Sequence, residues 1–285
     1  MIDPYVNNPK SAKYHVKKYL VSISNELKQK VVLDLAAGSG VTSEILQELG
    51  AHVEAYDLFP EYFALPGMQC TRCDILNRVP VADGYADMVI CQEGVEHFSD
   101  QMKAFKEFNR ILKPGGRLLI TTPSYSNLKS KLSYLLFECE DLNKLMPPNE
   151  LDSVWMAERS LNNEIYYGHI FLAGVQKLRV TGKLCGFRIQ KVQFTRINKT
   201  SAYLFPLFYP FIWLSSRFTY AKSMKRNPQI KKEVKEKVYG EQMRLNTDPK
   251  ILLDAHTFII YEKETELSDV FNDVQNAIKP FDQIM

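Results

Sequence analysis

An apolar run that ends in an acid and two glycines is the feature of this sequence that most constrains its fold. Residues 31–40 read Val-Val-Leu-Asp-Leu-Ala-Ala-Gly-Ser-Gly, which predicts a strand followed at once by a tight turn. In residues 41–49, Ile45 and Leu49 share one helical face, and Gly50 is a typical helix stop. Backbone N–H groups at the start of such a helix, beside glycines without a Cβ, favour a small-molecule site.

A second strand follows this helix and ends in another acid. Residues 52–57 read His-Val-Glu-Ala-Tyr-Asp, and Asp57 stands where a carboxylate can accept hydrogen bonds from both hydroxyls of a ribose. The dinucleotide fingerprint Gly-x-Gly-x-x-Gly is absent, because Ser43 occupies its third position. A Gly-x-Gly after a strand also fits an ordinary turn between a strand and a helix. The pattern therefore indicates a nucleoside-binding half whose ligand must be decided by later motifs.

Strands and helices continue to alternate along the chain. We expect further strands at residues 68–73, 88–91, 117–122, 188–197 and 252–261, and helices at 10–28, 99–112 and 175–184. The run Lys113-Pro-Gly-Gly116 is expected to end the second of these helices. The chain is therefore predicted to have an α/β fold, a doubly wound, Rossmann-like, mostly parallel seven-stranded sheet with helices on both faces. Insertions are expected after the fifth and sixth strands.

Three motifs resemble those of the class I S-adenosylmethionine-dependent methyltransferases. Residues 34–40, Asp-Leu-Ala-Ala-Gly-Ser-Gly, resemble that family's Asp-x-Gly-x-Gly-x-Gly loop, with Ala36 in place of the first glycine. Residues 92–97, Gln-Glu-Gly-Val-Glu-His, resemble the Glu-x-x-Glu-His of a subgroup that includes small-molecule and quinone O-methylating enzymes. The helix, Lys-Pro-Gly-Gly and strand that follow resemble the family's hallmark. The resemblance covers residues 31–123 and weakens afterwards.

This resemblance implies S-adenosylmethionine as cofactor, with S-adenosylhomocysteine as product. Asp34 is implied to lie near the amino group of the methionine part, and Gln92 beside the transferable methyl. Asp74 is implied to accept a hydrogen bond from the adenine amine while Ile75 packs on the ring, although an Asx turn explains Asp74 equally well. The expected cofactor contacts are Asp34, Ala36, Gly38, Ser39, Gly40, Asp57, Leu58, Asp74, Ile75 and Gln92.

Two histidines are candidates for a catalytic base. His169 precedes the helix at 175–184 and a Gly-Phe pair, an arrangement that recurs in the same subgroup, and Tyr166 and Tyr167 are candidate substrate contacts that orient or stack. His97 could instead only bind a neighbouring loop, and His169 could cap the helix. Sulfonium methyl transfer is an in-line displacement, so a base matters only for a hydroxyl or a protonated amine.

Composition restricts the partners and the compartment. Lys and Arg exceed Asp and Glu by 36 to 33, a net charge of +3 that gives no reason to expect nucleic acid. The five cysteines favour a reducing compartment, and Cys70-Thr-Arg-Cys73 is read as structural thiols because no second such pair exists. No metal site is predicted. The amino-terminal residues lack the pattern of a secretion signal, so we expect a cytoplasmic protein.

The segment at residues 203–214 is unusually apolar and aromatic, and it is interrupted by Pro206 and Pro210. It is shorter than the roughly 20 residues that span a bilayer. Basic residues follow it up to position 232, and together they predict a peripheral contact with the inner face of an anionic membrane that presents a lipid-linked acceptor. A hydrophobic lid or a dimer face explains the segment equally well.

These patterns together divide the chain and suggest its function. We expect a helical cover at residues 1–29, a methyltransferase core at 30–200 and 250–263 with a substrate cap at about 124–168, a hydrophobic and basic insertion at 201–249, and a tail at 264–285. The expected activity (EC 2.1.1.-) moves a methyl group to a small-molecule, glycan or lipid-linked acceptor, with oxygen favoured. The alternatives are S-adenosylmethionine binding without turnover and, less favoured, a nicotinamide-dependent oxidoreductase. The oligomeric state is left open.

Overall fold

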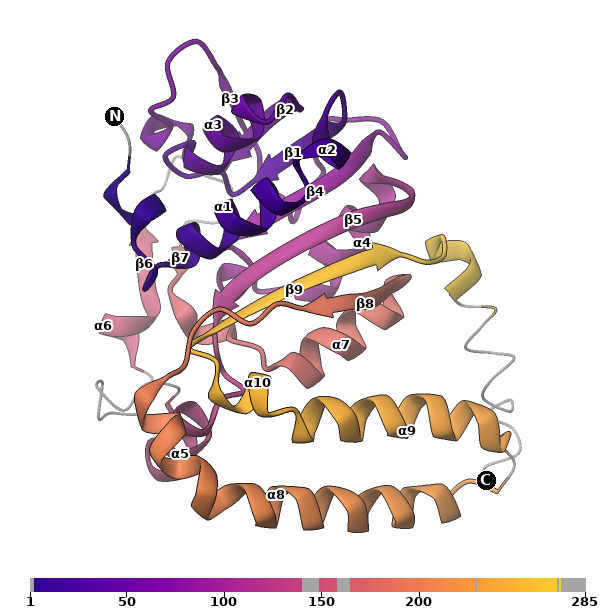
Figure 1. Cartoon of the computed structure of the whole chain (residues 1–285). Helices are drawn as coiled ribbons and strands as arrows, with labels where there is room; N and C mark the ends of the chain where they lie inside the picture. The colour runs from indigo at the N-terminus through magenta and orange to yellow at the C-terminus, as the bar shows by residue number, and fades with distance from the viewer. Residues whose placement is uncertain (1–2, 140–148, 158–164, 229, 271, 273–285) are drawn as a thin grey trace.

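A computed structural model describes residues 3–139, 149–157, 165–228, 230–270 and 272 of the chain (Figure 1). A seven-stranded sheet has the strand order β3-β2-β1-β4-β5-β9-β8. The first five of these run parallel, and β9 is antiparallel to both of its neighbours. The strands of this sheet are β1 (Val31–Leu35), β2 (His52–Asp57), β3 (Cys70–Arg72), β4 (Ala86–Gln92), β5 (Leu112–Pro123), β8 (Phe187–Val192) and β9 (His256–Lys263). The predicted Rossmann-like, mostly parallel sheet is confirmed.

Helices cover both faces of this sheet because its strands are apolar on both sides. In β4, Met88 and Ile90 pack into one buried cluster, whereas Val89 and Cys91 pack into the other. The first cluster includes α1 (Ala12–Ser22), α2 (Ser24–Leu27) and α3 (Val41–Glu48). The second includes α4 (Gln101–Ile111), α7 (Val175–Leu184), α9 (Lys232–Thr247) and α10 (Pro249–Leu253).

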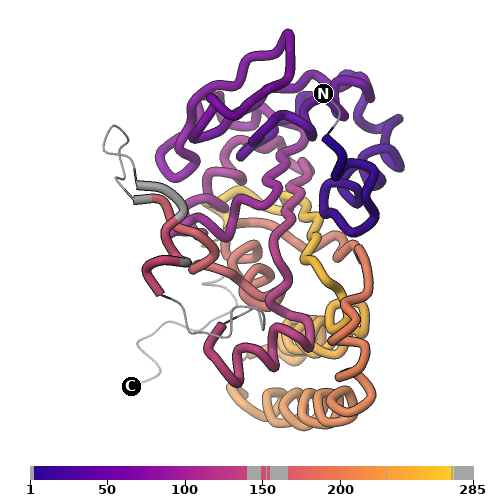
Figure 2. The backbone as a smooth tube through the Cα atoms, turned by 90° about the vertical axis from the view of Figure 1, so that its left-hand side faces the viewer, coloured from indigo at the N-terminus to yellow at the C-terminus, as the bar shows by residue number. Residues whose placement is uncertain are grey.

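The remaining elements connect or flank the sheet and these helices. They are α5 (Leu128–Phe137), α6 (Glu150–Ser153), α8 (Lys199–Lys225), the separate ribbon of β6 (Val154–Ala157) and β7 (Ile165–Tyr167), and the short 3₁₀ turns η1 (Pro4–Asn7), η2 (Pro60–Tyr62), η3 (Val95–His97) and η4 (His169–Phe171). Helices α8 and α9 pack against each other at the end of the molecule far from β3, as both views show (Figures 1 and 2). No helix in the described part of the chain is long and apolar enough to cross a membrane.

Several predicted boundaries are wrong for identifiable reasons. The helix expected at 10–28 breaks after Ser22, whose hydroxyl donates to the carbonyl of Tyr19 at 2.6 Å and competes with the backbone ladder. The run at 113–116 does not simply end α4, because it forms a bulge within β5 in which Gly115 has a φ of +75°.

The strand expected at 252–261 begins only at His256. Pro249–Leu253 forms α10 instead, because Asp248 accepts a hydrogen bond from the backbone N–H of Lys250 and Pro249 fits the first helical turn. The strand expected at 188–197 ends at Val192, and the one at 68–73 shrinks to Cys70–Arg72, whereas α7 has its predicted bounds. Much of the predicted tail and part of the predicted cap lie outside the described residues.

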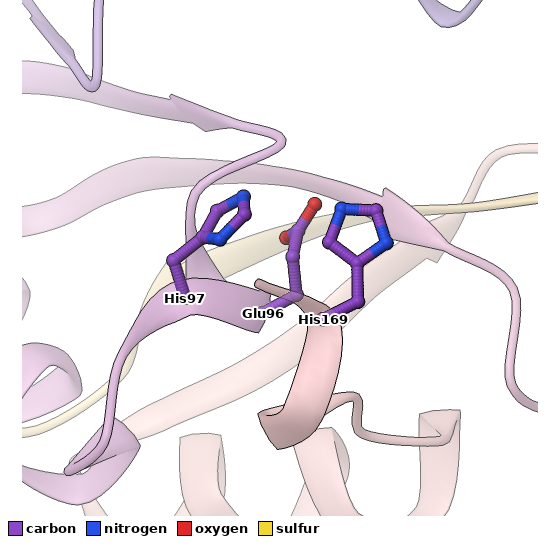
Figure 3. A group of neighbouring side chains, drawn as sticks. All are labelled: Glu96, His97 and His169. Atoms are coloured by element: carbon purple, nitrogen blue, oxygen red, sulfur yellow. The ribbon is translucent and has the colours of Figure 1, made fainter. Parts of the chain in front are cut away.

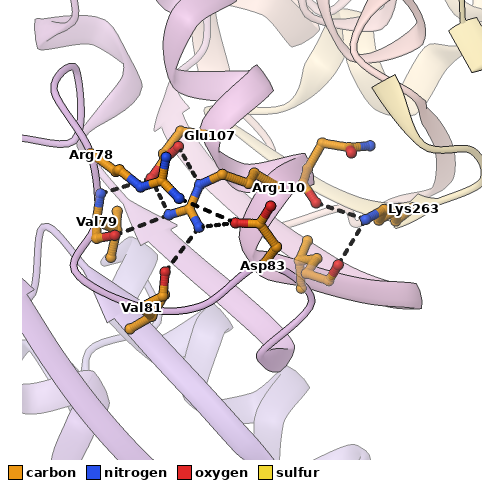
Figure 4. Close-up of polar contacts among 9 residues, drawn as sticks. Arg78, Val79, Val81, Asp83, Glu107, Arg110 and Lys263 are labelled. Atoms are coloured by element: carbon orange, nitrogen blue, oxygen red, sulfur yellow. Dashed lines mark hydrogen bonds and ion pairs between the residues drawn. The ribbon is translucent and has the colours of Figure 1, made fainter. Parts of the chain in front are cut away.

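Arg110 fastens the loop between β3 and β4 to α4 (Figure 4). Its guanidinium donates to the carbonyl oxygens of Val79 and Val81, and it also forms ion pairs with Glu107 and Asp83 at 2.6 Å. The carboxylate of Glu107 accepts the backbone N–H of Val79 at 2.7 Å. This network fixes the entry to β4, the strand that leads into the site.

Replacing Arg110 by Met should lower the free energy of unfolding by about 2–3 kcal/mol. The change leaves the half-buried carboxylate of Glu107 without its cation and two carbonyls without their donor. Arg188→Met is the matched control, because its ion pair with Glu262 is exposed and should contribute less than about 1 kcal/mol. Urea unfolding of both variants measures the difference, and equal losses would contradict this assignment.

Candidate functional site

A cavity of about 440 Å³ opens at the carboxyl ends of β1, β2, β3 and β4. It lies where the strand order reverses between β1 and β4, which is the usual ligand position in open α/β sheets. Its volume is within the range of small-molecule sites. Nine predicted cofactor contacts line it, namely Asp34, Ala36, Gly38, Ser39, Asp57, Leu58, Asp74, Ile75 and Gln92.

The turn between β1 and α3 forms one wall of the cavity through left-handed backbone at Ala36, Gly38 and Gly40. A Cβ on Gly38 would meet no atom within 4 Å, so the space beside it stays open to a ligand. Gly40 does not line the cavity. It begins α3 with a φ of +86°, and a Cβ there would come within 2.8 Å of the ring of Phe63. Ala36 has a φ of +64°, a conformation that costs a non-glycine residue about 1 kcal/mol.

Asp57 ends β2 and is held by two backbone amides. Its Oδ2 accepts the N–H of Gly38 and its Oδ1 accepts the N–H of Phe59, both at 2.8 Å. Each carboxylate oxygen has two lone pairs, so both remain able to accept a further hydrogen bond. The carboxylate is therefore pre-oriented beside the glycine turn.

Asp34 lies buried behind this wall, near the end of β1. Its carboxyl group accepts a 2.6 Å hydrogen bond from the hydroxyl of Ser43 in α3. Burial raises the pKa of Asp34 to about 6, with the hydrogen bond from Ser43 opposing the rise and the negative charge of Asp57 adding to it. A cationic group entering the cavity would favour the charged form of this carboxyl.

Asp74 and Ile75 follow β3 at the far side of the cavity. Asp74 forms an Asx turn, in which its carboxylate accepts the backbone N–H of Leu76 at 2.9 Å and the side-chain amide of Asn77 at 3.0 Å. Ile75 is buried and lines the cavity. The turn and the expected contact with adenine are compatible, because the turn fixes the acid beside an apolar platform. The contact itself stays a prediction.

Gln92 and His97 bound the other end of the cavity. The side-chain oxygen of Gln92 accepts the hydroxyl of Thr42 at 2.9 Å. Nδ1 of His97 lies 2.8 Å from the carbonyl oxygen of Tyr167, which can only accept, so Nδ1 carries the proton. Tyr166 and Tyr167 both line the cavity, and the ring of Tyr166 packs edge-on against Phe59 at 5.2 Å.

His169 does not line the cavity, but its ring centroid lies 5.2 Å from that of His97. Figure 3 shows the carboxyl group of Glu96 between these two imidazole rings. The structure thus brings together the two histidines that were singled out as candidate bases, and it adds a carboxyl group to them.

The two acidic residues of the motif at 92–97, Glu93 and Glu96, have no role predicted from the sequence. Glu93 has a φ of +52° and accepts hydrogen bonds from Thr121 at 2.6 Å and from His256 at 2.7 Å. Burial acts to raise the pKa of Glu93, but its hydrogen bond and charge pairing with His256 hold that pKa below its usual value. Glu96 is 1% exposed, and burial together with the charge of Glu93 raises its pKa to about 8.

Lys13, Thr42 and Phe59 also contribute to the cavity and were not predicted. The Glu-x-x-Glu-His spacing was a usable signal for Glu93 and Glu96. No local pattern connects Glu93 to His256, which lies 163 positions later in the chain.

Comparisons with known proteins agree with this geometry. Residues 33–120 match the model of a methyltransferase domain family. The structure of a S-adenosylmethionine-dependent methyltransferase from Archaeoglobus fulgidus superimposes with a TM-score of 0.51 at 15% identity, covering 92% of this chain and all of that one. The chain therefore has the Rossmann-like methyltransferase fold. Within that fold, residues 33–120 are the part of the chain that is similar to the methyltransferase domain family.

Two curated relatives are more similar in sequence. A demethylmenaquinone methyltransferase of Chlorobaculum parvum is 32% identical over 127 residues, 42% of this chain and 52% of the relative. A ubiquinone biosynthesis O-methyltransferase of Xanthomonas oryzae is 27% identical over 184 residues, 57% of this chain and 75% of the relative. The chain thus spans about half the length of the first relative.

The buried Asp34 should make stability depend on pH. Its pKa is about 6 in the folded state against an ordinary 3.8, so between these values only the folded state keeps the proton. Its contribution to the free energy of unfolding therefore falls by up to about 1.4 kcal/mol per pH unit as pH rises towards 6, and is constant above that.

Asp34→Asn removes this titration while keeping an acceptor for Ser43. Urea unfolding of both proteins from pH 4 to 8 should show the variant gaining stability relative to the natural protein up to about pH 6, with no further gain above it. A stability difference that does not change with pH would contradict the burial-driven shift.

Proposed function

We propose that this protein transfers a methyl group from S-adenosylmethionine to an oxygen of a small, quinone-like acceptor. The observation that carries the proposal is the convergence of the glycine turn, the anchored carboxylate of Asp57 and an apolar platform on one cavity. The names of the two curated relatives support the acceptor class, and one of them specifies O-methylation.

The residues of the cavity fit the donor part by part. The two anchored oxygens of Asp57 would accept the ribose hydroxyls, and Asp74 with Ile75 would hold the adenine. Asp34, behind the open space at Gly38, would face the amino group of the methionine part. When bound, S-adenosylmethionine supplies an electrophilic methyl group whose leaving group is a neutral thioether.

The acceptor end of the cavity is built to orient a planar ring and to take up a proton. Tyr166 and Tyr167 offer aromatic surface on one side, and Gln92 lies at the end of β4. Because the carbonyl of Tyr167 fixes the proton of His97 on Nδ1, Nε2 carries the lone pair that can accept a proton from a hydroxyl. Positioning supplies most of the acceleration, and such a base adds roughly two to four powers of ten.

Asp57→Ala should weaken the binding of S-adenosylmethionine about a hundredfold, because two hydrogen bonds to a charged acceptor are lost. Glu54→Gln is the matched control, since this residue of the same strand binds the hydroxyl of Tyr56 outside the cavity and should leave affinity unchanged. Titration calorimetry measures both, and NAD titrated in parallel should give no heat. Unchanged affinity in Asp57→Ala, or tight binding of NAD, would overturn the donor assignment.

We infer further that the acceptor is reached from a membrane surface through α8. Five apolar residues of α8 recur every three or four positions and are 59–83% exposed, namely Tyr203, Leu207, Phe211, Leu214 and Phe218. A helix packed on a protein in water normally turns such a stripe inward. The notable feature of α8 is that its apolar stripe faces solvent.

The charge of α8 suits an anionic lipid surface. Its 27 residues contain no Asp or Glu and four basic residues, and the guanidinium of Arg217 lies over the ring of Trp213. Helix α5, which follows β5 at the cavity's edge of the sheet, is joined to α8 by a 3.0 Å hydrogen bond from the N–H of Lys129 to Ser201. It exposes Leu135 and Leu136 as well. The lack of acidic residues beside this exposed apolar stripe favours lipid over a lid or a dimer face.

Serine substitutions on the stripe test this inference. Leu207, Phe211 and Phe218 changed together to Ser should reduce flotation with phosphatidylglycerol-containing vesicles at least about tenfold, because buried apolar area drives such binding. Changing Tyr5, Val21 and Val180, which are also exposed, is the control and should leave flotation unaltered. If the natural protein does not float, or if the stripe variant only converts a dimer to a monomer, the membrane inference fails.

A further inference from the structure

Glu96, His97 and His169 form a cluster of metal-ligating groups beside the donor cavity. One ligand atom from each side chain lies within 4.8 Å of the other two. They come from the two 3₁₀ turns η3 and η4, which pack together although they are far apart in the sequence (Figure 3). His97 also lines the cavity, so the cluster adjoins the acceptor end of the site.

The donor set suits a first-row divalent cation. Two imidazole nitrogens and one carboxylate oxygen are typical ligands of Zn²⁺ and of Fe²⁺, and they leave positions open for an exogenous oxygen. Ligand atoms bound to zinc at 2.0–2.1 Å lie about 3.3 Å apart in a tetrahedral site. Side-chain rotations that move each atom by about 1 Å would bring this cluster to that spacing.

The carboxyl group of Glu96 independently points to a ligand. It is 1% exposed, and neither of its oxygens has a hydrogen-bond partner of good geometry among the described residues, although the hydroxyl of Thr122 is near enough to lower its pKa. Burying a carboxylate in this way costs several kcal/mol unless a cation or donors compensate it. The negative charge of the nearby Glu93 carboxylate, which Thr121 and His256 engage, adds repulsion to this cost.

Neighbouring groups hold the cluster in place. The carbonyl of Tyr167 accepts the Nδ1 proton of His97, as backbone carbonyls commonly do for metal-bound histidines. The side-chain amide of Gln101 donates to the carbonyl of Val95 at 2.9 Å and to that of Phe171 at 2.7 Å. Because Gln101 is buried, this pair of hydrogen bonds ties η3 to η4 without depending on any ligand.

We propose that Glu96, His97 and His169 bind one divalent first-row cation, with Zn²⁺ as the first probe, and that this cation holds the acceptor oxygen. The second part rests on the proposed function. With the cation bound, Nε2 of His97 would be a ligand and no longer a base, so the acceptor O–H bond would break with its proton passing to water. The oxygen lone pair would then form the bond to the methyl carbon. The carbon–sulfur bond would break with its electron pair staying on sulfur.

Metal titration tests the site without reference to activity. Protein freed of metal with a chelator should bind about one equivalent of Zn²⁺ in competition with a chromophoric chelator. Co²⁺ in its place should give the visible absorption of a low-symmetry nitrogen and oxygen site. Glu96→Gln and His169→Ala should each weaken Zn²⁺ binding by at least about a hundredfold, since even outer-shell changes cost ten- to a hundredfold.

His52→Ala is the matched control. His52 is exposed, lies at the amino end of β2 and thus away from the cavity, and pairs with Gln29. It should bind Zn²⁺ like the natural protein. Stoichiometric binding that survives in both cluster variants, or no stoichiometric binding by the natural protein, would overturn the proposal. His169 lies on an exposed turn, so His169→Ala decides the question even if Glu96→Gln fails to fold.

Calorimetry with S-adenosylmethionine separates this proposal from the proposed function. The metal-free natural protein should bind S-adenosylmethionine as tightly as the metal-loaded protein, because the donor contacts lie outside the cluster. Metal binding without donor binding would refute the proposed function and leave the cation site standing. Donor binding without metal binding would refute the cation site and leave the proposed function standing.

Discussion

The hydrogen bond from the backbone N–H of Gly38 to the carboxylate of Asp57 is the contact on which the site depends. It joins the end of β2 to the turn between β1 and α3, and so fixes both walls of the cavity with one interaction. The turn holds three residues in left-handed conformation, and such backbone persists only where its surroundings determine it. The carboxylate that the ligand would use is thus also the group that shapes the binding loop. Under the proposed function, recognition of the ribose and stability of the turn would therefore depend on the same carboxylate.

The lining of the cavity around the glycine turn could be predicted from sequence because its determinants are local. Parallel strands bring their carboxyl ends to one edge, so residues that follow β1, β2, β3 and β4 must meet there whatever the loops do. The acceptor half could not be predicted in this way. His169 reaches Glu96 through the packing of η4 on η3, and His256 reaches Glu93 because β9 runs antiparallel beside β5. Neither relation leaves a spacing in the sequence. Ala36, although it is a mismatch to the loop pattern, occupies a glycine-like conformation.

The two halves also differ in their electrostatics. The donor side holds anchored carboxylates, one of them buried enough to have a raised pKa. The acceptor side concentrates Glu93, Glu96 and three of the five histidines of the chain around the end of β4. A cation-binding cluster there would give the protein a way to activate an oxygen without a conventional catalytic triad. The outward apolar stripe of α8 fits an acceptor that partitions into lipid, and α5 connects that stripe to the cavity's edge.

The most direct test of this account is a crystal structure of the protein with S-adenosylhomocysteine. We predict that the ribose hydroxyls lie within hydrogen-bond distance of both oxygens of Asp57, with the adenine on Ile75 and the sulfur directed towards Gln92 and His97. Adenosyl density outside this cavity, or a bound ribose that does not contact Asp57, would contradict the account.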